Sequence, residues 1–93
     1  MVIWAPRAIA DIKEAWDFIA MDNEPAADRV VAAVQLTGDS LDQFPNRGRR
    51  GRKPGTREMV VLRTPYILIY HIHRTGVEIA RVVHGAQDWP AKG

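Results

Sequence analysis

Residues 45–56, PNRGRRGRKPGT, divide this chain of 93 residues into two halves that follow different hydrophobic periods. Gly48, Gly51, Pro54 and Gly55 are expected to keep the segment out of helix and strand. Before it, apolar residues recur at helical spacing; after it, they gather in short runs rich in valine, isoleucine and tyrosine, as in strands. The chain is therefore predicted to be an α+β protein with its helices first and most of its strands last.

Two amphipathic helices are predicted in the first half. Pro6 opens the first, since proline tolerates the first helical position, and the helix should end near Met21. Its apolar stripe consists of Ile9, Ile12, Trp16 and Ile19. The acidic residues off this stripe, which are expected to face water, are Asp11, Glu14 and Asp17.

The second helix is predicted to start at Pro25, with Asn23 or Glu24 as its cap, and to end before Pro45. Its apolar stripe runs through Ala27, Val30, Val31, Val34, Gly38, Leu41 and Phe44. Gly38 weakens a helix by about 1 kcal/mol relative to alanine. Close approach of the first helix is the expected compensation.

Four strands are predicted, of which residues 2–4 form a short edge strand. The three long strands cover roughly residues 57–63, 66–73 and 77–84. Because the connections at residues 64–65 and 74–76 are short, these three strands must be antiparallel. The expected architecture is a single domain over residues 1–93, in which an N-terminal strand and a helical hairpin pack on one face of a small antiparallel sheet and leave the other face open.

Charge is divided unevenly along the chain. Residues 1–44 carry eight acids and three bases, whereas residues 45–93 carry ten bases and three acids, so balances of −5 and +7 give the net charge of +2. The predicted partner-binding or nucleic-acid-binding residues are the bases of the loop, together with one tryptophan in the C-terminal tail: Arg47, Arg49, Arg50, Arg52, Lys53 and Trp89. Such a basic face suits an anionic partner, either a nucleic acid or an acidic protein segment.

Composition excludes several classes of protein. The chain has no cysteine, so disulfides and thiolate metal sites are ruled out. His71 and His73 form a possible metal-binding pair on one strand face, but no third ligand is in view, and we expect neither a metal nor a cofactor. The chain also lacks an apolar run long enough to span a membrane and a signal peptide, so a cytoplasmic protein without membrane contact is expected.

Four segments, in this order and spacing, resemble the RelE/ParE superfamily of bacterial toxins: WAPRAIADIKEAWDFIA, GRRGRKPGTREMVV, PYILIYHI and RVVHGAQDWP. The resemblance covers nearly the whole chain. It implies the toxin of a type II toxin–antitoxin (plasmid stabilisation) system, which inhibits growth and is neutralised by a cognate antitoxin. Contact with operator DNA would come only through that antitoxin.

The resemblance implies two alternative activities. RelE-like members cut messenger RNA on the ribosome, and Arg57, Arg81 and His84 stand at positions suited to that chemistry. ParE-like members act on DNA gyrase. The lysine pair and C-terminal tyrosine of RelE-like nucleases have no counterpart here, which favours a ParE-like toxin that acts on gyrase. An mRNA interferase is the alternative.

Arg81 and His84 are three residues apart, so a regular strand would point them to opposite faces. A bulge near Val83, or a strand that ends before His84, would bring them together. In the alternative interpretation, Arg81 is a structural ion-pair partner and His84 a hydrogen-bonded strand end. Trp89 either folds back on the sheet or anchors a partner.

Overall fold

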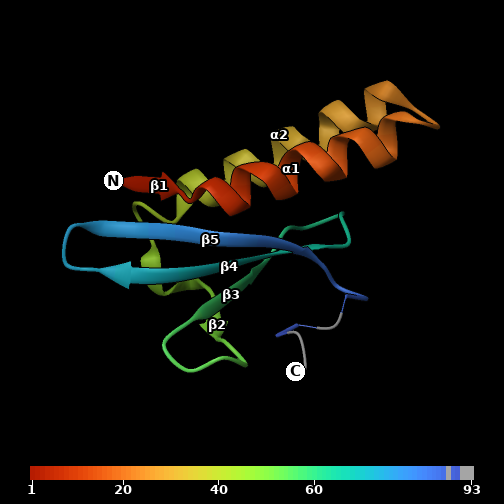
Figure 1. Cartoon of the computed structure of the whole chain (residues 1–93). Helices are drawn as coiled ribbons and strands as arrows, with labels where there is room; N and C mark the ends of the chain where they lie inside the picture. Colours follow the sequence, from red (N-terminus) through yellow and green to blue (C-terminus); the bar gives the residue numbers. More distant parts are fainter. Residues whose placement is uncertain (88, 91–93) are drawn as a thin grey trace.

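The computed structural model describes residues 1–87, 89 and 90, and places two helices on one side of a five-stranded sheet (Figure 1). The elements follow one another as β1 (Val2–Trp4), α1 (Pro6–Ala20), α2 (Glu24–Ser40), the 3-10 turn η1 (Pro45–Arg47), β2 (Arg49–Arg50), β3 (Arg57–Val60), β4 (Tyr66–His73) and β5 (Gly76–His84). The strand order is β1-β5-β4-β3-β2, in which β1 runs parallel to β5 and the other neighbours are antiparallel. The predicted α+β architecture is confirmed.

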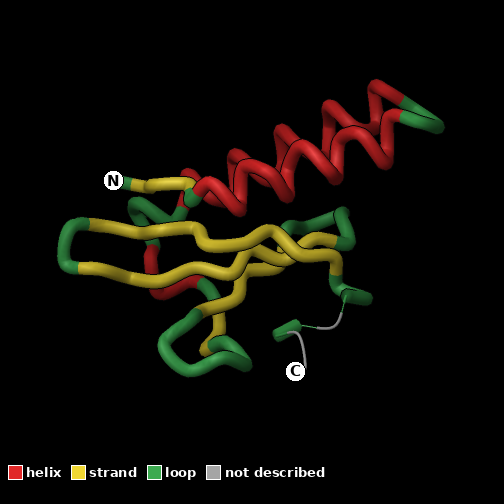
Figure 2. The backbone as a smooth tube through the Cα atoms, in the orientation of Figure 1, coloured by secondary structure: helices red, strands yellow, loops and turns green. Residues whose placement is uncertain are grey.

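Both helices and the long hairpin follow the sequence pattern closely. Asn23 caps α2, since its side chain accepts a hydrogen bond from the backbone N–H of Ala26. The β4–β5 hairpin dominates the sheet (Figure 2). Strand β3 ends at Val60, three residues before the predicted end, because Arg63 (φ 64°) lies in a tight turn closed by a hydrogen bond from Thr64 N to Val61 O. Among the described residues, neither helix is long and apolar enough to cross a membrane.

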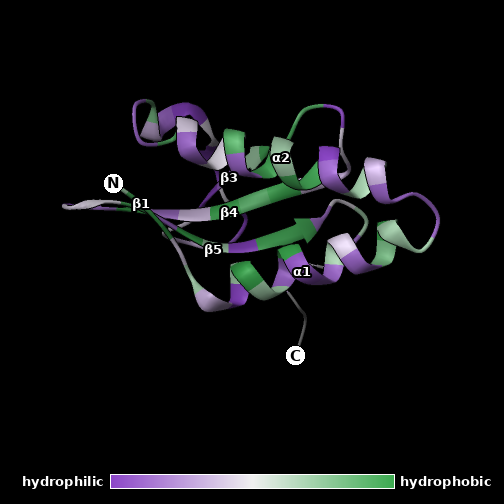
Figure 3. Cartoon of the chain, turned by 90° about the horizontal axis from the view of Figure 1, so that it is seen from above, coloured by the Kyte–Doolittle hydropathy of each residue, from purple (hydrophilic) through white to green (hydrophobic). Residues whose placement is uncertain are grey.

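The core lies between the helices and the face of the sheet that they cover (Figure 3). Its buried residues include Ala8, Ala15, Val34, Leu41, Tyr66, Leu68, Tyr70, Val77, Ile79 and Val82. The predicted stripe of α1 is partly wrong: Ile9 is 56% exposed, and α1 instead turns Ala8 and Ala15 inward. These small side chains let the helix approach the sheet closely.

Gly38 is buried on α2, but its close neighbour differs from the predicted one. A Cβ atom at this position would lie 2.3 Å from Cζ2 of Trp4 and 2.7 Å from Cδ1 of Ile79. The glycine therefore makes room for β1 and β5, and not for the first helix. An isolated sequence cannot reveal this, because the tryptophan arrives from 34 positions away.

The face of the sheet away from the helices is not fully open, contrary to prediction. Ile69 on β4 and Val83 on β5 belong to that face by register, and they are 0% and 1% exposed. The described residues that follow β5, residues 85–87, 89 and 90, lie on this side of the sheet in Figure 1. Val60 and Ile67 of the same face remain 49% exposed and half-buried, respectively, so the uncovered area lies toward β3.

Candidate functional site

The basic loop folds around a buried carboxylate. Glu58 of β3 is only 2% exposed. Its Oε1 atom accepts a hydrogen bond from Nη2 of Arg49 at 3.0 Å, while its Oε2 atom accepts from Nε and from the backbone N–H of Arg52 at 3.2 and 2.9 Å. The register places Arg49 directly opposite Glu58, so their side chains share one face. Two of the five loop bases therefore neutralise this chain's own acid.

Strand β2 corrects the prediction that the loop stays out of regular structure. Arg49 and Arg50 pair with β3, and the backbone N–H of Gly51 donates to Thr56 O at 2.8 Å. The pairing depends on a partner strand and on the contacts of Glu58 with Arg49 and Arg52, here called the Glu58 clamp. Local strand propensity contains neither of these. The loop is consequently fixed at both ends of its turn.

Several opposing effects set the pKa of Glu58. Burial raises the pKa, but hydrogen bonds from the backbone N–H of Arg52 and from the side chains of Arg52 and Arg49, together with the charge of Arg52, outweigh burial. The net result is a pKa below the ordinary value for this carboxyl. Glu58 is therefore ionised at neutral pH, and the clamp is formed.

The other three loop bases point outward. Arg47, Arg50 and Lys53 are exposed, and within residues 1–87, 89 and 90 none of them forms an ion pair. Arg47 has one weak contact, from Nη1 to Oγ of Ser40 at 3.4 Å. Three of the five predicted bases thus present their charge to solvent.

Arg57 supports the start of this loop. Its Nη1 atom donates to Gly48 O at 2.7 Å. The buried Tyr70 hydroxyl accepts from the backbone N–H of Gly48 at 2.9 Å and donates to Pro45 O at 2.7 Å. A Cβ atom on Gly48 would lie 2.6 Å from that hydroxyl oxygen, so the turn requires glycine. Arg57 and Tyr70 together shape the corner between η1 and β2.

Arg81 lies at the opposite edge of the sheet and is paired with a second buried carboxylate. Its Nε and Nη2 atoms donate to Oδ2 and Oδ1 of Asp11 at 2.8 and 3.2 Å. Asp11 Oδ2 also accepts from the backbone N–H of Val82 at 2.9 Å. Strand β1 ends at Trp4, so beyond that point β5 has no partner strand on this side. The Asp11 carboxylate takes the place of that strand as the acceptor for the backbone N–H of Val82. The structure thus gives Arg81 the ion-pair role that was the alternative interpretation.

Asp11 was predicted to face water, and that prediction is wrong, since the residue is 6% exposed. Helical periodicity placed it off the apolar stripe, but its partners come from β5, 70 residues away. One signal was available: Arg7 precedes Asp11 by four positions on the helix and donates to its Oδ1 at 3.3 Å. For Glu58, the available sign of an ion pair was that it is the first acid to follow the five bases of the loop.

His84 ends β5 on the side of the sheet that the helices cover. It pairs with Tyr66, and the two rings meet edge-to-face with centroids 5.5 Å apart. The backbone N–H of Ala86 donates to Nδ1 of His84 at 3.0 Å. Neither condition that would bring Arg81 and His84 to one face is met: β5 extends to His84, and its register shift falls at Ala80 and not near Val83, so the two positions keep opposite faces.

Arg81 and His84 nevertheless line one groove between α1 and the edge of β5. The groove has a volume of about 500 Å³. Its other lining residues are Arg7, Asp11, Glu14, Ala15, Phe18, Tyr66, Val82, Ala86 and Gln87. Arg57 is not among them, because it belongs to β3, on the other side of β4. The three predicted catalytic residues are therefore not brought together.

Trp89 folds back on the chain, one of its two predicted arrangements. The guanidinium carbon of Arg81 lies over the Trp89 ring, 5.3 Å from its centroid. This is cation–π distance. Arg81 is thereby held between a carboxylate and an aromatic ring, and its side chain is only 18% exposed.

The histidine pair on β4 is engaged in other contacts. Nε2 of His73 lies 3.1 Å from Oε1 of Glu78, and Nδ1 of His71 lies 3.2 Å from Gly55 O. In the described part of the chain, no group of three or more metal-binding side chains is present.

Comparison with known proteins places this geometry in a family. The family model described as the ParE toxin of the type II toxin–antitoxin system parDE matches residues 2–89. The Y4kP protein of Sinorhizobium fredii, named as a toxin, is 42% identical over 94% of this chain and 90% of its own length. Toxin RelE2 of Caulobacter vibrioides is 35% identical over 92% of this chain and 96% of its own.

Solved structures agree with this fold. The chromosomal ParDE system of P. aeruginosa contains a chain that superposes with a TM-score of 0.81 at 22% identity, covering 89% of this chain and 92% of that one. The toxin–antitoxin complex RelBE2 of Mycobacterium tuberculosis gives a TM-score of 0.65 at 27% identity, over 90% and 95% of the two chains. On the family match and the two curated relatives, this chain belongs to the ParE toxin family of type II toxin–antitoxin systems.

Proposed function

We propose that this toxin inhibits growth by docking on DNA gyrase and not by cutting RNA. The observation that carries the proposal is the engagement of Arg81. RNA cleavage needs a cation directed at the phosphate in the transition state and a proton-transfer group beside it. Arg81 instead donates its hydrogen bonds to Asp11 and lies against Trp89. Arg57 belongs to β3, on the other side of β4, and donates to the backbone carbonyl of Gly48.

We also propose that a cognate antitoxin neutralises the chain in the cytoplasm by covering the surface that meets the target. The solved relatives are named as a ParDE system and as a RelBE2 toxin–antitoxin complex. The exposed bases Arg50 and Lys53 suit an acidic segment of such a partner. Operator DNA would be reached through the antitoxin alone.

A ribosome-dependent endonuclease is the second candidate, and two observations favour it. Arg81 and His84 line the same groove, and the Caulobacter relative carries the name RelE2. In this case His84 would be the proton-transfer group, placed beside Arg81 in the groove. Asp11 would have to release or share Arg81 when RNA binds.

Inducing the chain in bacterial cells separates the two candidates. Under the gyrase proposal, primer extension should find intact messages, while gyrase–DNA breaks accumulate and the SOS response is induced. His84→Ala should inhibit growth as strongly as the unaltered chain, because the side chain of His84 is exposed and gyrase docking requires no proton transfer. Messages cut at codon-spaced sites, with cutting lost in His84→Ala or Arg57→Ala chains that still unfold cooperatively, would overturn the proposal in favour of the nuclease.

A further inference from the structure

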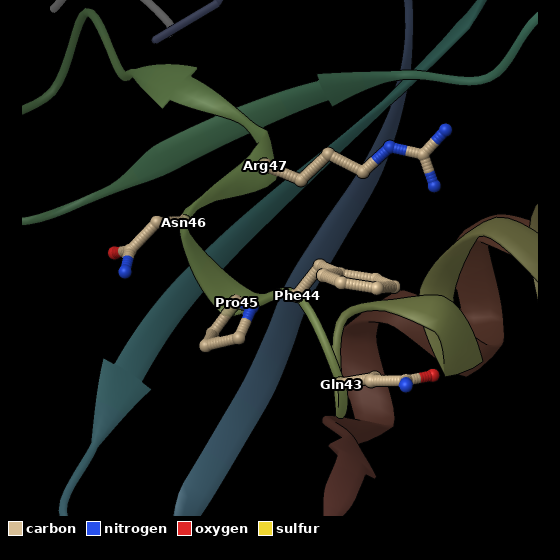
Figure 4. A pocket seen from close by; sticks show the side chains of 5 residues that line it. All are labelled: Gln43, Phe44, Pro45, Asn46 and Arg47. Atoms are coloured by element: carbon tan, nitrogen blue, oxygen red, sulfur yellow. The ribbon is translucent and has the colours of Figure 1, made fainter.

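A pocket of about 690 Å³ lies where α2 gives way to η1, outside both arginine–carboxylate clusters. It is lined by Gln43, Phe44, Pro45, Asn46 and Arg47. Figure 4 shows that the side chains of Arg47, Phe44 and Gln43 project in the same direction, with the ring of Phe44 between the other two. A cation, an aromatic face and an amide are therefore presented side by side.

Phe44 is the unexpected member of this group. The helical stripe predicts it in the core, yet 56% of its surface is exposed. The backbone explains the exposure: α2 ends at Ser40, and Phe44 then adopts the non-helical angles φ −128° and ψ 68° before Pro45. The ring is thus carried away from the packed face of the helix, beside the basic loop.

We propose that this pocket binds one unpaired nucleotide of a single-stranded nucleic acid. The base stacks on the Phe44 ring, the guanidinium of Arg47 contacts a phosphate, and the amide of Gln43 reaches a polar edge of the base. Stacking on aromatic side chains and arginine contacts to phosphate are the usual means by which proteins hold single strands. Both DNA and RNA present this chemistry.

Charge supports a nucleic acid as the occupant. None of the five lining residues is acidic. Beyond the pocket, positive charge continues through Arg50 and Lys53, which are exposed and form no ion pair with residues 1–87, 89 or 90. A strand anchored at Phe44 would thus find further cations for its neighbouring phosphates. This inference does not depend on whether gyrase or the ribosome is the toxin's target.

Fluorescence anisotropy with short labelled single strands, one of DNA and one of RNA, tests the site on the full chain. Phe44→Ala should weaken binding about tenfold, since stacking of one base is lost. Phe44→Trp, which keeps an aromatic face, should bind like the unaltered chain. Arg47→Ala should weaken binding and reduce the slope of log K against log salt by about 0.7, as expected for one lost phosphate contact on a single strand. Tighter binding of one strand identifies the natural ligand as DNA or RNA.

Leu36→Ala is the matched control. Leu36 is also an exposed apolar side chain, 72% accessible, and it lies on α2 but does not line the pocket. Its loss should leave binding unchanged. The proposal is overturned if the unaltered chain binds neither strand at about 50 mM salt, if Phe44→Ala binds as tightly as the unaltered chain, if Leu36→Ala weakens binding equally, or if a duplex of the same sequence binds as well as the single strands.

Discussion

The buried carboxylates of Asp11 and Glu58 accept hydrogen bonds from the same kinds of donor, but they connect different parts of the fold. Asp11 is 6% exposed and Glu58 is 2% exposed. Each accepts hydrogen bonds from two arginine side chains and from one backbone N–H on a strand or loop. In both cases a buried negative charge is tolerated because its hydrogen-bonding capacity is filled.

The difference lies in what each carboxylate joins. The partners of Glu58 are six and nine residues away, so Glu58 fixes one loop. Arg81 and Val82 are 70 and 71 residues from Asp11, so Asp11 joins α1 to β5. Loss of a contact between distant elements should weaken the whole fold, whereas loss of a local clamp should open one segment.

Removing the Asp11 carboxylate is expected to have the largest effect. Asp11→Ala leaves the guanidinium of Arg81 and the N–H of Val82 without their partner, which should lower the free energy of unfolding by about 3–5 kcal/mol. Urea denaturation measures this loss. Glu14→Ala is the control, because Glu14 lines the same groove on the same helix but is exposed. Equal losses in the two variants would show that the link between α1 and β5 adds no more to the free energy of unfolding than an exposed acid on the same helix does.

The same contrast explains how much the sequence could predict. The bounds of β4, residues 66–73, follow from local alternation, and the structure reproduces them. Both helices and the hairpin were likewise predictable, since their signals lie within a few residues. The role of Asp11, the pairing of β2 and the bulge at Ala80 depend on contacts between distant residues or on register, which a single sequence does not contain.

The candidate site was predictable only in its composition. The loop bases and Trp89 were identified from their residue types. The sequence did not separate Arg49 and Arg52, which pair with Glu58, from Arg50 and Lys53, which form no ion pair within the described residues. The separation follows from the strand alternation that places Arg49 opposite Glu58. It could therefore be read only once the β2–β3 register was known.

A smaller and more local effect is expected for Glu58. Glu58→Gln keeps the shape of the side chain but removes its charge, which should lower the free energy of unfolding by about 1–3 kcal/mol. The loop should also open, so trypsin should cut after Arg50 or Arg52 faster than in the unaltered chain. Glu78→Gln is the matched control, since the side chain of Glu78 is 41% exposed. Unchanged cleavage in Glu58→Gln would mean that the carboxylate does not hold the loop.

Acid should remove part of the Glu58 contribution. Its folded-state pKa lies below the ordinary value of 4.5, so its contribution is fully present above pH 4.5 and is lost as the pH falls through the lower, folded-state value. Urea denaturation across this acidic range should show stability falling more steeply in the unaltered chain than in Glu58→Gln. Parallel curves would contradict a lowered pKa at this site.

The smallest effects should come from the more exposed arginine of each cluster, and they refine the comparison. The side chains of Arg7 and Arg49 are 62% and 65% exposed, so Arg7→Ala and Arg49→Ala should each cost about 0.2–1 kcal/mol despite lying in different clusters. Arg81 is only 18% exposed and donates twice to Asp11. Double-mutant cycles with Asp11→Ala should therefore give a larger coupling free energy for Arg81 than for Arg7. Equal couplings would mean that solvent exposure does not set the strength of these pairs, and that the two carboxylates differ only in the distance along the chain that each one spans.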